Sequence, residues 1–146
     1  MENPSASVKA AQEFASQLIT TKVSKEVTFH TLQHTREVVA ACSKIAEQEN
    51  LTEEDLQALL IGAWLHDTGY SAGKAKGHEL VSVQHMDDFF SKYPADPAFI
   101  EKVKGCILAT RMPQNPQNRI EEIICDADLF HLGSPDFKVK SKLLRD

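Results

Sequence analysis

The sequence has few of the features that mark membrane, fibrous or secreted proteins. Its 146 residues include 3 cysteines, 6 glycines, 6 prolines and 1 tryptophan. No run approaches the ~18 apolar residues that a transmembrane helix needs. The N-terminal residues are acidic where a secretory signal would be basic, and no apolar core follows them. These absences exclude a collagen-like, disordered or membrane-spanning chain. The length of the chain predicts a single domain over residues 1–146.

The cysteines lack the spacing of a disulfide framework or a structural zinc site. Cys42, Cys106 and Cys125 are odd in number and far apart, and each has apolar neighbours. We interpret them as buried reduced thiols. Because thiols stay reduced in a reducing compartment, these cysteines predict a cytoplasmic location.

Positive charge is also scarce. The chain has 16 Lys and Arg against 21 Asp and Glu, for a net charge of -5. Proteins that bind nucleic acid through its backbone normally carry a basic face, so bulk nucleic-acid binding is not expected. A small phosphate ligand needs only one or two cations and remains compatible with this balance. A membrane partner is not expected, and a homo-oligomer is compatible with the sequence.

Apolar residues recur at helical spacing in six stretches, and none shows the sustained alternation of a strand. The predicted helices cover residues 6–20, 31–49, 52–67, 78–90 and 120–132, and a further helix begins at 96 and extends beyond 108. A loop is predicted over 112–118. Thr52 and Asp55 resemble a capping box at the start of the third helix. The sequence therefore predicts an all-α bundle. A helical pattern that begins at 138 breaks off at the end of the sequence, which suggests a chain that continues past residue 146.

Histidines and aspartates occur on three of these predicted helices, as His30 and His34, His66 and Asp67, and Asp126 and Asp128. Each alone has an ordinary explanation as a capping, core or solvated residue. Together, imidazole and carboxylate suit a divalent first-row metal ion. Neighbouring residues diverge by ~100° on a regular helix, so His66 and Asp67 can converge only where the helix ends. The helix-breaking pair Thr68 and Gly69 predicts such an end.

In this order the residues resemble the H…HD…D pattern of the HD-domain metal-dependent phosphohydrolases. The resemblance spans residues 28–133 and includes AWLHDTGY at 63–70, His78 and Glu79 with Ser82, and DADL at 126–129. It implies a helical bundle that binds a divalent metal ion, with His34, His66 and Asp67 among the ligands.

The fourth ligand is Asp126 or Asp128. They lie ~160° apart around a helix, so only one can face a given site. The apolar stripe lies about equally between them, and periodicity does not choose. The last motif of the family aligns with Ala127, Asp128 and Leu129, which favours Asp128.

The segment Phe29 to Thr35 is similar to the Tyr-His-Asn-x-x-His-Ala stretch of the class I cyclic-nucleotide phosphodiesterases, with Thr31 in place of the asparagine. In those enzymes the first histidine protonates the leaving oxygen. The resemblance implies that His30 is a general acid, a role suited to the near-neutral pKa of imidazole. His30 and Asp67 are the predicted catalytic residues, Asp67 being a ligand as well.

Four residues are candidates for substrate binding, namely Lys74, Lys76, His78 and Arg111. The lysines lie in a basic linker next to the predicted metal, and an arginine can bind phosphate bidentately. A place in a solvated loop or at a helix cap explains each of these residues about as well as substrate binding does.

The number of metal ions is expected to be one. Some dinuclear relatives carry a histidine pair after the fifth helix, and this sequence has Thr110 and Arg111 there. A second ion would need His78 as an additional ligand. His85 and His131 are interpreted as structural.

The expected function is hydrolysis of phosphate monoesters or diesters in small molecules, nucleotides above all, with a metal-activated water as nucleophile. The donor set does not distinguish Mn, Fe, Co, Ni, Mg or Zn. One alternative is an HD module that binds a nucleotide or a partner without catalysis. A weaker one is the oxygenase chemistry of a few diiron relatives, which needs extra ligands.

Overall fold

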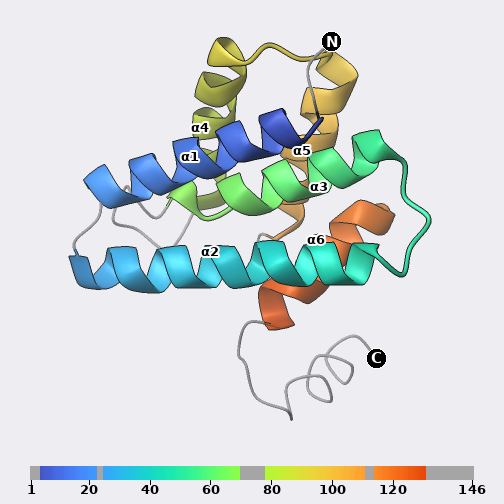
Figure 1. Cartoon of the computed structure of the whole chain (residues 1–146), viewed down its shortest axis with the longest axis horizontal. Helices are drawn as coiled ribbons and strands as arrows, with labels where there is room; N and C mark the ends of the chain where they lie inside the picture. Colours follow the sequence, from blue (N-terminus) through green and yellow to red (C-terminus); the bar gives the residue numbers. More distant parts are fainter. Residues whose placement is uncertain (1–3, 23–24, 70–77, 111–113, 131–146) are drawn as a thin grey trace.

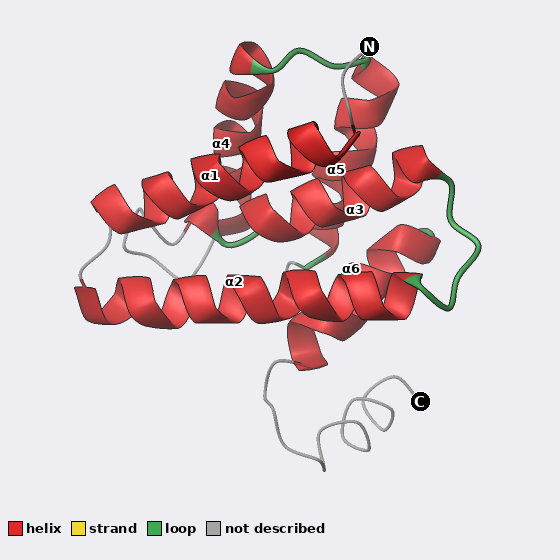
Figure 2. Cartoon of the chain, viewed as in Figure 1, coloured by secondary structure: helices red, strands yellow, loops and turns green. Residues whose placement is uncertain are grey.

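A computed structural model describes residues 4–22, 25–69, 78–110 and 114–130. These residues form six helices and no strand (Figures 1 and 2). The helices are α1 (Pro4–Lys22), α2 (Lys25–Ala46), α3 (Glu53–Leu65), α4 (His78–Lys92), α5 (Pro97–Ala109) and α6 (Arg119–Phe130). The predicted all-α bundle of about six helices is therefore confirmed. In this part of the chain no helix combines the length and hydropathy that a membrane crossing requires.

Local capping signals explain where three helices begin. The Thr52 hydroxyl accepts a hydrogen bond from the Asp55 amide at the start of α3, and the Asp96 carboxylate accepts one from the Ala98 amide at the start of α5. At α6, the Asn118 side chain accepts from the Glu121 amide and donates to the Glu121 carboxylate. The first of these bonds satisfies a backbone amide that the first helical turn leaves open, and the second holds the two side chains together.

The second helix differs most from its predicted bounds. It begins at Lys25 rather than near residue 31 and ends at Ala46 rather than near 49. At its end, the amides of Gln48 and Glu49 bond to carbonyls three residues back, a tighter pattern than the α-helix. At its start the prediction was wrong because it relied on an apolar stripe, and that stripe begins only at Val38. Periodicity locates a helix through its apolar stripe, and it does not mark helical turns that precede the stripe.

Helix α3 is the central element of the bundle. It contacts α1, α2, α4, α5 and α6, and residues 58–65 are buried except for Leu60 (Figure 1). A helix that is apolar on almost every side is expected to lie inside the fold. The C-terminal end of α3, where His66 follows, is therefore held within the core.

The three cysteines are buried and none forms a disulfide, as predicted. Burial raises the pKa of the Cys42 and Cys106 thiols well above the ordinary range. These thiols behave as small apolar side chains between the helices.

Gly62 lies at a close approach of α3 to α5. A Cβ at this position would lie 2.8 Å from the Cβ of Cys106. Overpacking of this kind costs about 1–3 kcal/mol and is partly offset by the ~1 kcal/mol gain in helix propensity. We expect Gly62→Ala to lower the free energy of unfolding in urea by up to about 2 kcal/mol. Gln84→Ala, on an exposed face of α4, serves as the control. An unchanged or higher stability of Gly62→Ala would contradict the close packing of α3 on α5.

Candidate metal centre

His66 and Asp67 lie at the point where α3 ends. Leu65 is the last residue of the helix, His66 is its C-cap, and a turn continues to Gly69. The Nδ1–H of His66 donates to the carbonyl of Ala63 at 2.7 Å, which leaves Nε2 as the atom that faces the site. Both side chains are almost completely buried, with His66 at 0% and Asp67 at 4% exposure. As predicted, the adjacent histidine and aspartate converge where the helix stops.

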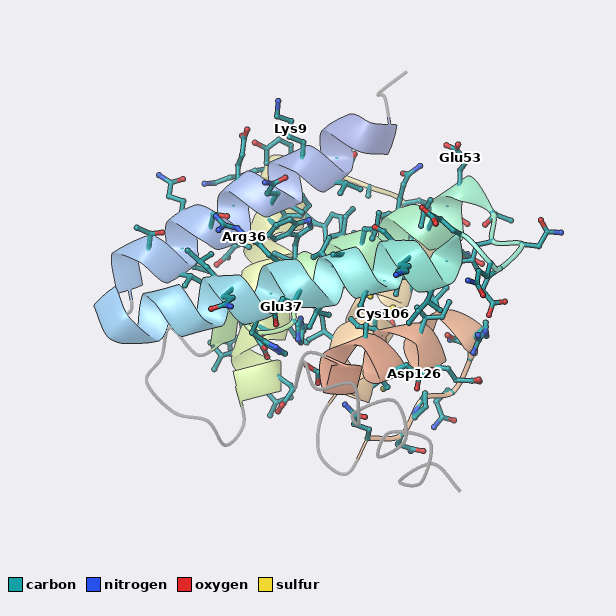
Figure 3. The ribbon with its side chains drawn as sticks, turned by 60° about the horizontal axis from the view of Figure 1, so that its bottom comes forward. Lys9, Arg36, Glu37, Glu53, Cys106 and Asp126 are labelled. Carbon is teal, nitrogen blue, oxygen red and sulfur yellow. The ribbon has the colours of Figure 1, made fainter. Side chains whose placement is uncertain are left out.

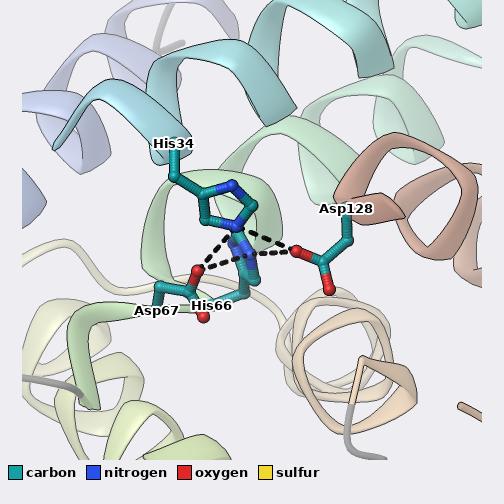
Figure 4. A group of neighbouring side chains, drawn as sticks. All are labelled: His34, His66, Asp67 and Asp128. Carbon is teal, nitrogen blue, oxygen red and sulfur yellow. Dashed lines mark hydrogen bonds and ion pairs between the residues drawn. The ribbon is translucent and has the colours of Figure 1, made fainter. Parts of the chain in front are cut away.

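Two other helices each contribute one side chain to the same place. His34 comes from α2 and Asp128 from α6, and both point toward His66 and Asp67 (Figure 4). The Nε2 of His34 lies 2.9 Å from Oδ2 of Asp67 and 3.0 Å from Oδ1 of Asp128. The Nε2 of His66 lies 3.1 Å and 3.3 Å from the same two oxygens. One ligand atom from each of the four residues thus lies within 4.8 Å of the others.

The close contacts between imidazole nitrogens and carboxylate oxygens require a positive charge at the site. A neutral His66, with its proton on Nδ1, would direct the lone pair of Nε2 toward two carboxylate oxygens. Protons on the imidazoles or a cation between the four atoms would remove that repulsion. Burial by itself lowers the pKa of His34, but hydrogen bonds to Asp128 and Asp67 outweigh it and raise that pKa to about 9. Burial likewise lowers the pKa of His66, and the same carboxylates hold it well above its usual value.

Asp128 responds in the opposite direction. Burial raises its pKa, yet hydrogen bonds with His34 and His66 lower it to about 2. The carboxylate therefore stays ionised throughout the neutral range. The cluster combines two imidazoles and two carboxylates, a donor set that suits a divalent first-row metal ion. These residues fit such an ion.

Asp126 does not belong to this cluster. It lies two residues before Asp128 on α6, is partly exposed, and is labelled in Figure 3. The ~160° between the two positions means that only one of them can point toward α2 and α3. The structure brings Asp128 to the site, in agreement with the motif alignment.

Several candidate residues lie outside what the structure describes. Lys74, Lys76 and Arg111 fall outside the described residues. His30 and His78 belong to α2 and α4 respectively, and their side chains are not among those described. His30 precedes His34 by four residues, so both positions lie on one face of α2.

Sequence reasoning missed Gln114, which follows α5. Its side-chain amide donates to Oδ2 of Asp128 at 3.2 Å, while Oδ1 of Asp128 faces the histidines. Groups that bond to the outer oxygen of a carboxylate ligand fix its orientation. Nothing in the predicted loop over 112–118 singled out this glutamine, because its role depends on a tertiary contact.

His85 was interpreted as structural, and Ser82 was noted only as part of a motif. Both lie on α4 against the turn that carries His66 and Asp67. Ser82 bonds to the backbone at both ends of this turn, and His85 bonds to the hydroxyl of Thr68. A helical spacing of three residues places the two on one face, which was the available signal.

Comparison with protein families gives a match, whereas comparisons with curated proteins and with solved structures give none. The family model described as HD domain matches residues 31–133. This range includes His34, His66, Asp67 and Asp128. Because the match covers more than half of the sequence, and the helical fold agrees with it, the chain belongs to the HD domain family.

Proposed function

We propose that the protein is a metal-dependent hydrolase of phosphate esters in small molecules, with nucleotides as the first substrate class to test. Members of the HD domain family are generally metal-dependent phosphohydrolases. The observation that carries the proposal is the convergence of His34 from α2, Asp128 from α6, and His66 and Asp67 from the turn that ends α3, within 4.8 Å. A module that only bound a partner would not need four buried or half-buried groups in this arrangement.

The chain's own residues would divide the work at this site. His34, His66, Asp67 and Asp128 would hold one divalent ion, which supplies Lewis acidity toward a phosphoryl oxygen and toward water. The hydrogen bond from Nδ1 of His66 to the Ala63 carbonyl keeps its Nε2 directed at the site. The buried Asp67 carboxylate is also proposed to accept the proton that an attacking water gives up.

Residues beyond the four are proposed to act on the substrate. His30 would protonate the leaving oxygen, because it lies one turn before His34 on the same face of α2. Lys74, Lys76, His78 and Arg111 are proposed to contact phosphate. The three buried cysteines, none in a disulfide, support a reducing and thus cytoplasmic location.

A metal-dependent phosphatase screen tests the proposal. Protein stripped with EDTA is assayed with added Mn, Co, Ni or Mg on p-nitrophenyl phosphate, its bis-ester, nucleoside monophosphates and cyclic nucleotides. Phosphate-ester cleavage that needs added metal, and that is absent from His66→Ala combined with Asp67→Ala, is expected. Nucleotide binding without turnover under every condition would favour the non-catalytic module instead. Equal behaviour of wild type and the double variant would contradict the proposal.

The protonation of His34 predicts how metal binding responds to pH. Its pKa of about 9 means that the metal-free site holds a proton there at neutral pH, and a metal ion must displace it. Asp128, with a pKa of about 2, is ionised already and adds no pH dependence in this range. Apparent affinity should therefore rise between pH 6 and pH 9, by up to about 10-fold per pH unit for each displaced proton. Calorimetric titration with Mn²⁺ in buffers of different ionisation enthalpy measures both affinity and proton release. A pH-independent affinity with no proton release would contradict the prediction.

A further inference from the structure

One face of α4 packs against the turn over residues 66–69. This turn follows α3 and carries His66 and Asp67, two of the ligands of the proposed site. Ser82 is fully buried and makes two hydrogen bonds there. Its hydroxyl donates to the carbonyl of His66 at 2.8 Å and accepts from the amide of Gly69 at 2.8 Å. A single hydroxyl thus satisfies two backbone groups that the end of α3 leaves without helical partners.

His85, one turn further along α4, contacts the same turn through Thr68. The Thr68 hydroxyl donates its proton to the carbonyl of Leu65 at 2.8 Å. Toward Nδ1 of His85, which lies 3.1 Å away, the hydroxyl oxygen therefore acts as acceptor, and Nδ1 carries the proton. The chain of bonds from His85 through Thr68 to Leu65 links α4 to the last residue of α3.

Together these bonds hold the chain on both sides of Asp67. Ser82 holds the peptide groups on either side of it, at His66 and Gly69, and His85 holds the side chain of Thr68. Adjacent side chains on a regular helix diverge by ~100°, so bringing His66 and Asp67 to one point requires a turn that is kept in place. Beside the bonds of His66 and Thr68 to carbonyls of α3, Ser82 and His85 of α4 supply contacts that hold this turn.

We infer that Ser82 and His85 are positioning residues that set the metal affinity of the site by holding the turn that carries His66 and Asp67. The inference rests on the proposed function, since it concerns the metal that this function requires. Groups that orient metal ligands typically change affinity or activity by about 10–100-fold when removed. Neither residue needs to touch the metal ion or the substrate for this effect.

The test measures Mn²⁺ affinity through the emission of Trp64. This is the one tryptophan of the sequence, is buried, and lies two residues before His66, so a paramagnetic ion in the site should quench it. Ser82→Ala and His85→Leu are expected to weaken Mn²⁺ binding by about 10–100-fold. His85→Asn, whose side-chain amide can still donate to Thr68, should recover most of the affinity. Gln84→Ala, which lies between them on the exposed face of α4, should bind Mn²⁺ as wild type does.

Thermal unfolding in EDTA separates positioning from a general loss of stability. A merely structural role would lower the unfolding midpoint of His85→Leu and leave the Mn²⁺ affinity of the folded protein unchanged, and that result would overturn the inference. If Ser82→Ala does not fold, the comparison of His85→Leu with His85→Asn decides. Wild-type protein that binds no Mn²⁺ would overturn the proposed function and this inference with it. Wild-type binding that is matched by all the α4 variants would overturn the inference alone.

Discussion

Asp128→Asn is expected to reduce metal-dependent phosphatase kcat/KM by at least about 100-fold and to weaken metal binding in parallel, whereas Asp126→Asn should change neither by more than about 2-fold. Loss of groups that only orient a metal ligand already costs about 10–100-fold, so loss of a charged ligand should cost more. The amide keeps the size of the carboxylate and removes the negative charge that His34 and His66 face at 3.0 Å and 3.3 Å.

The pair is matched because both aspartates lie on α6, two residues apart, and only Asp128 belongs to the cluster. Metal affinity is measured by calorimetry and turnover by phosphate release. Circular dichroism establishes that both variants retain their helices. An equal loss in both variants, or a larger loss in Asp126→Asn, would show that the fourth ligand is wrongly assigned.

His30→Ala is expected to lower kcat by about 10²–10⁴-fold on esters with alkoxide leaving groups such as nucleoside monophosphates. A general acid matters when the leaving oxygen is strongly basic. With p-nitrophenyl phosphate, whose leaving group is an acidic phenol, the same variant should lose much less. Metal affinity should stay unchanged, because His30 is proposed to act on the leaving oxygen and not as a metal ligand.

The contrast between substrates is the decisive part of this experiment. Gln33→Ala, on an exposed position of α2 next to His34, controls for disturbance of the helix. An equal decrease on both classes of substrate would argue that His30 binds the phosphate or supports the helix. Unchanged turnover on both would remove it from the mechanism.

Much of the fold could be predicted from the sequence because its signals are local. Thr52, Asp96 and the apolar stripes mark where helices begin and which side faces the core. The start of α2 could not be predicted in this way, since the stripe used to find that helix begins at Val38, more than three turns into it. The packing of α3 at the centre follows from its almost wholly apolar second half.

The site was predictable in a different way. The resemblance to the HD domain pattern identified His34, His66 and Asp67, and motif alignment rather than periodicity favoured Asp128. Periodicity could not decide, because the apolar stripe of α6 lies between Asp126 and Asp128, and only the packing of α6 on α2 shows which side faces the histidines.

The surrounding contacts could not be predicted from the sequence. Gln114 reaches Asp128 from the segment that follows α5, and Ser82 reaches the 66–69 turn from α4. Each of these bonds depends on the packing of two segments that are separated in the sequence. The spacing of Ser82 and His85 places both on one face of α4, but it does not say what that face packs against.

The proposed function depends on one divalent cation held by four side chains, from α2, α6 and the turn that ends α3. Anomalous diffraction from crystals grown with Mn²⁺, recorded above and below the manganese absorption edge, tests it most directly. One strong peak per chain is expected among Nε2 of His34, Nε2 of His66 and the carboxylates of Asp67 and Asp128. Absence of any peak at millimolar Mn²⁺, or a peak that none of these four residues contacts, would contradict it.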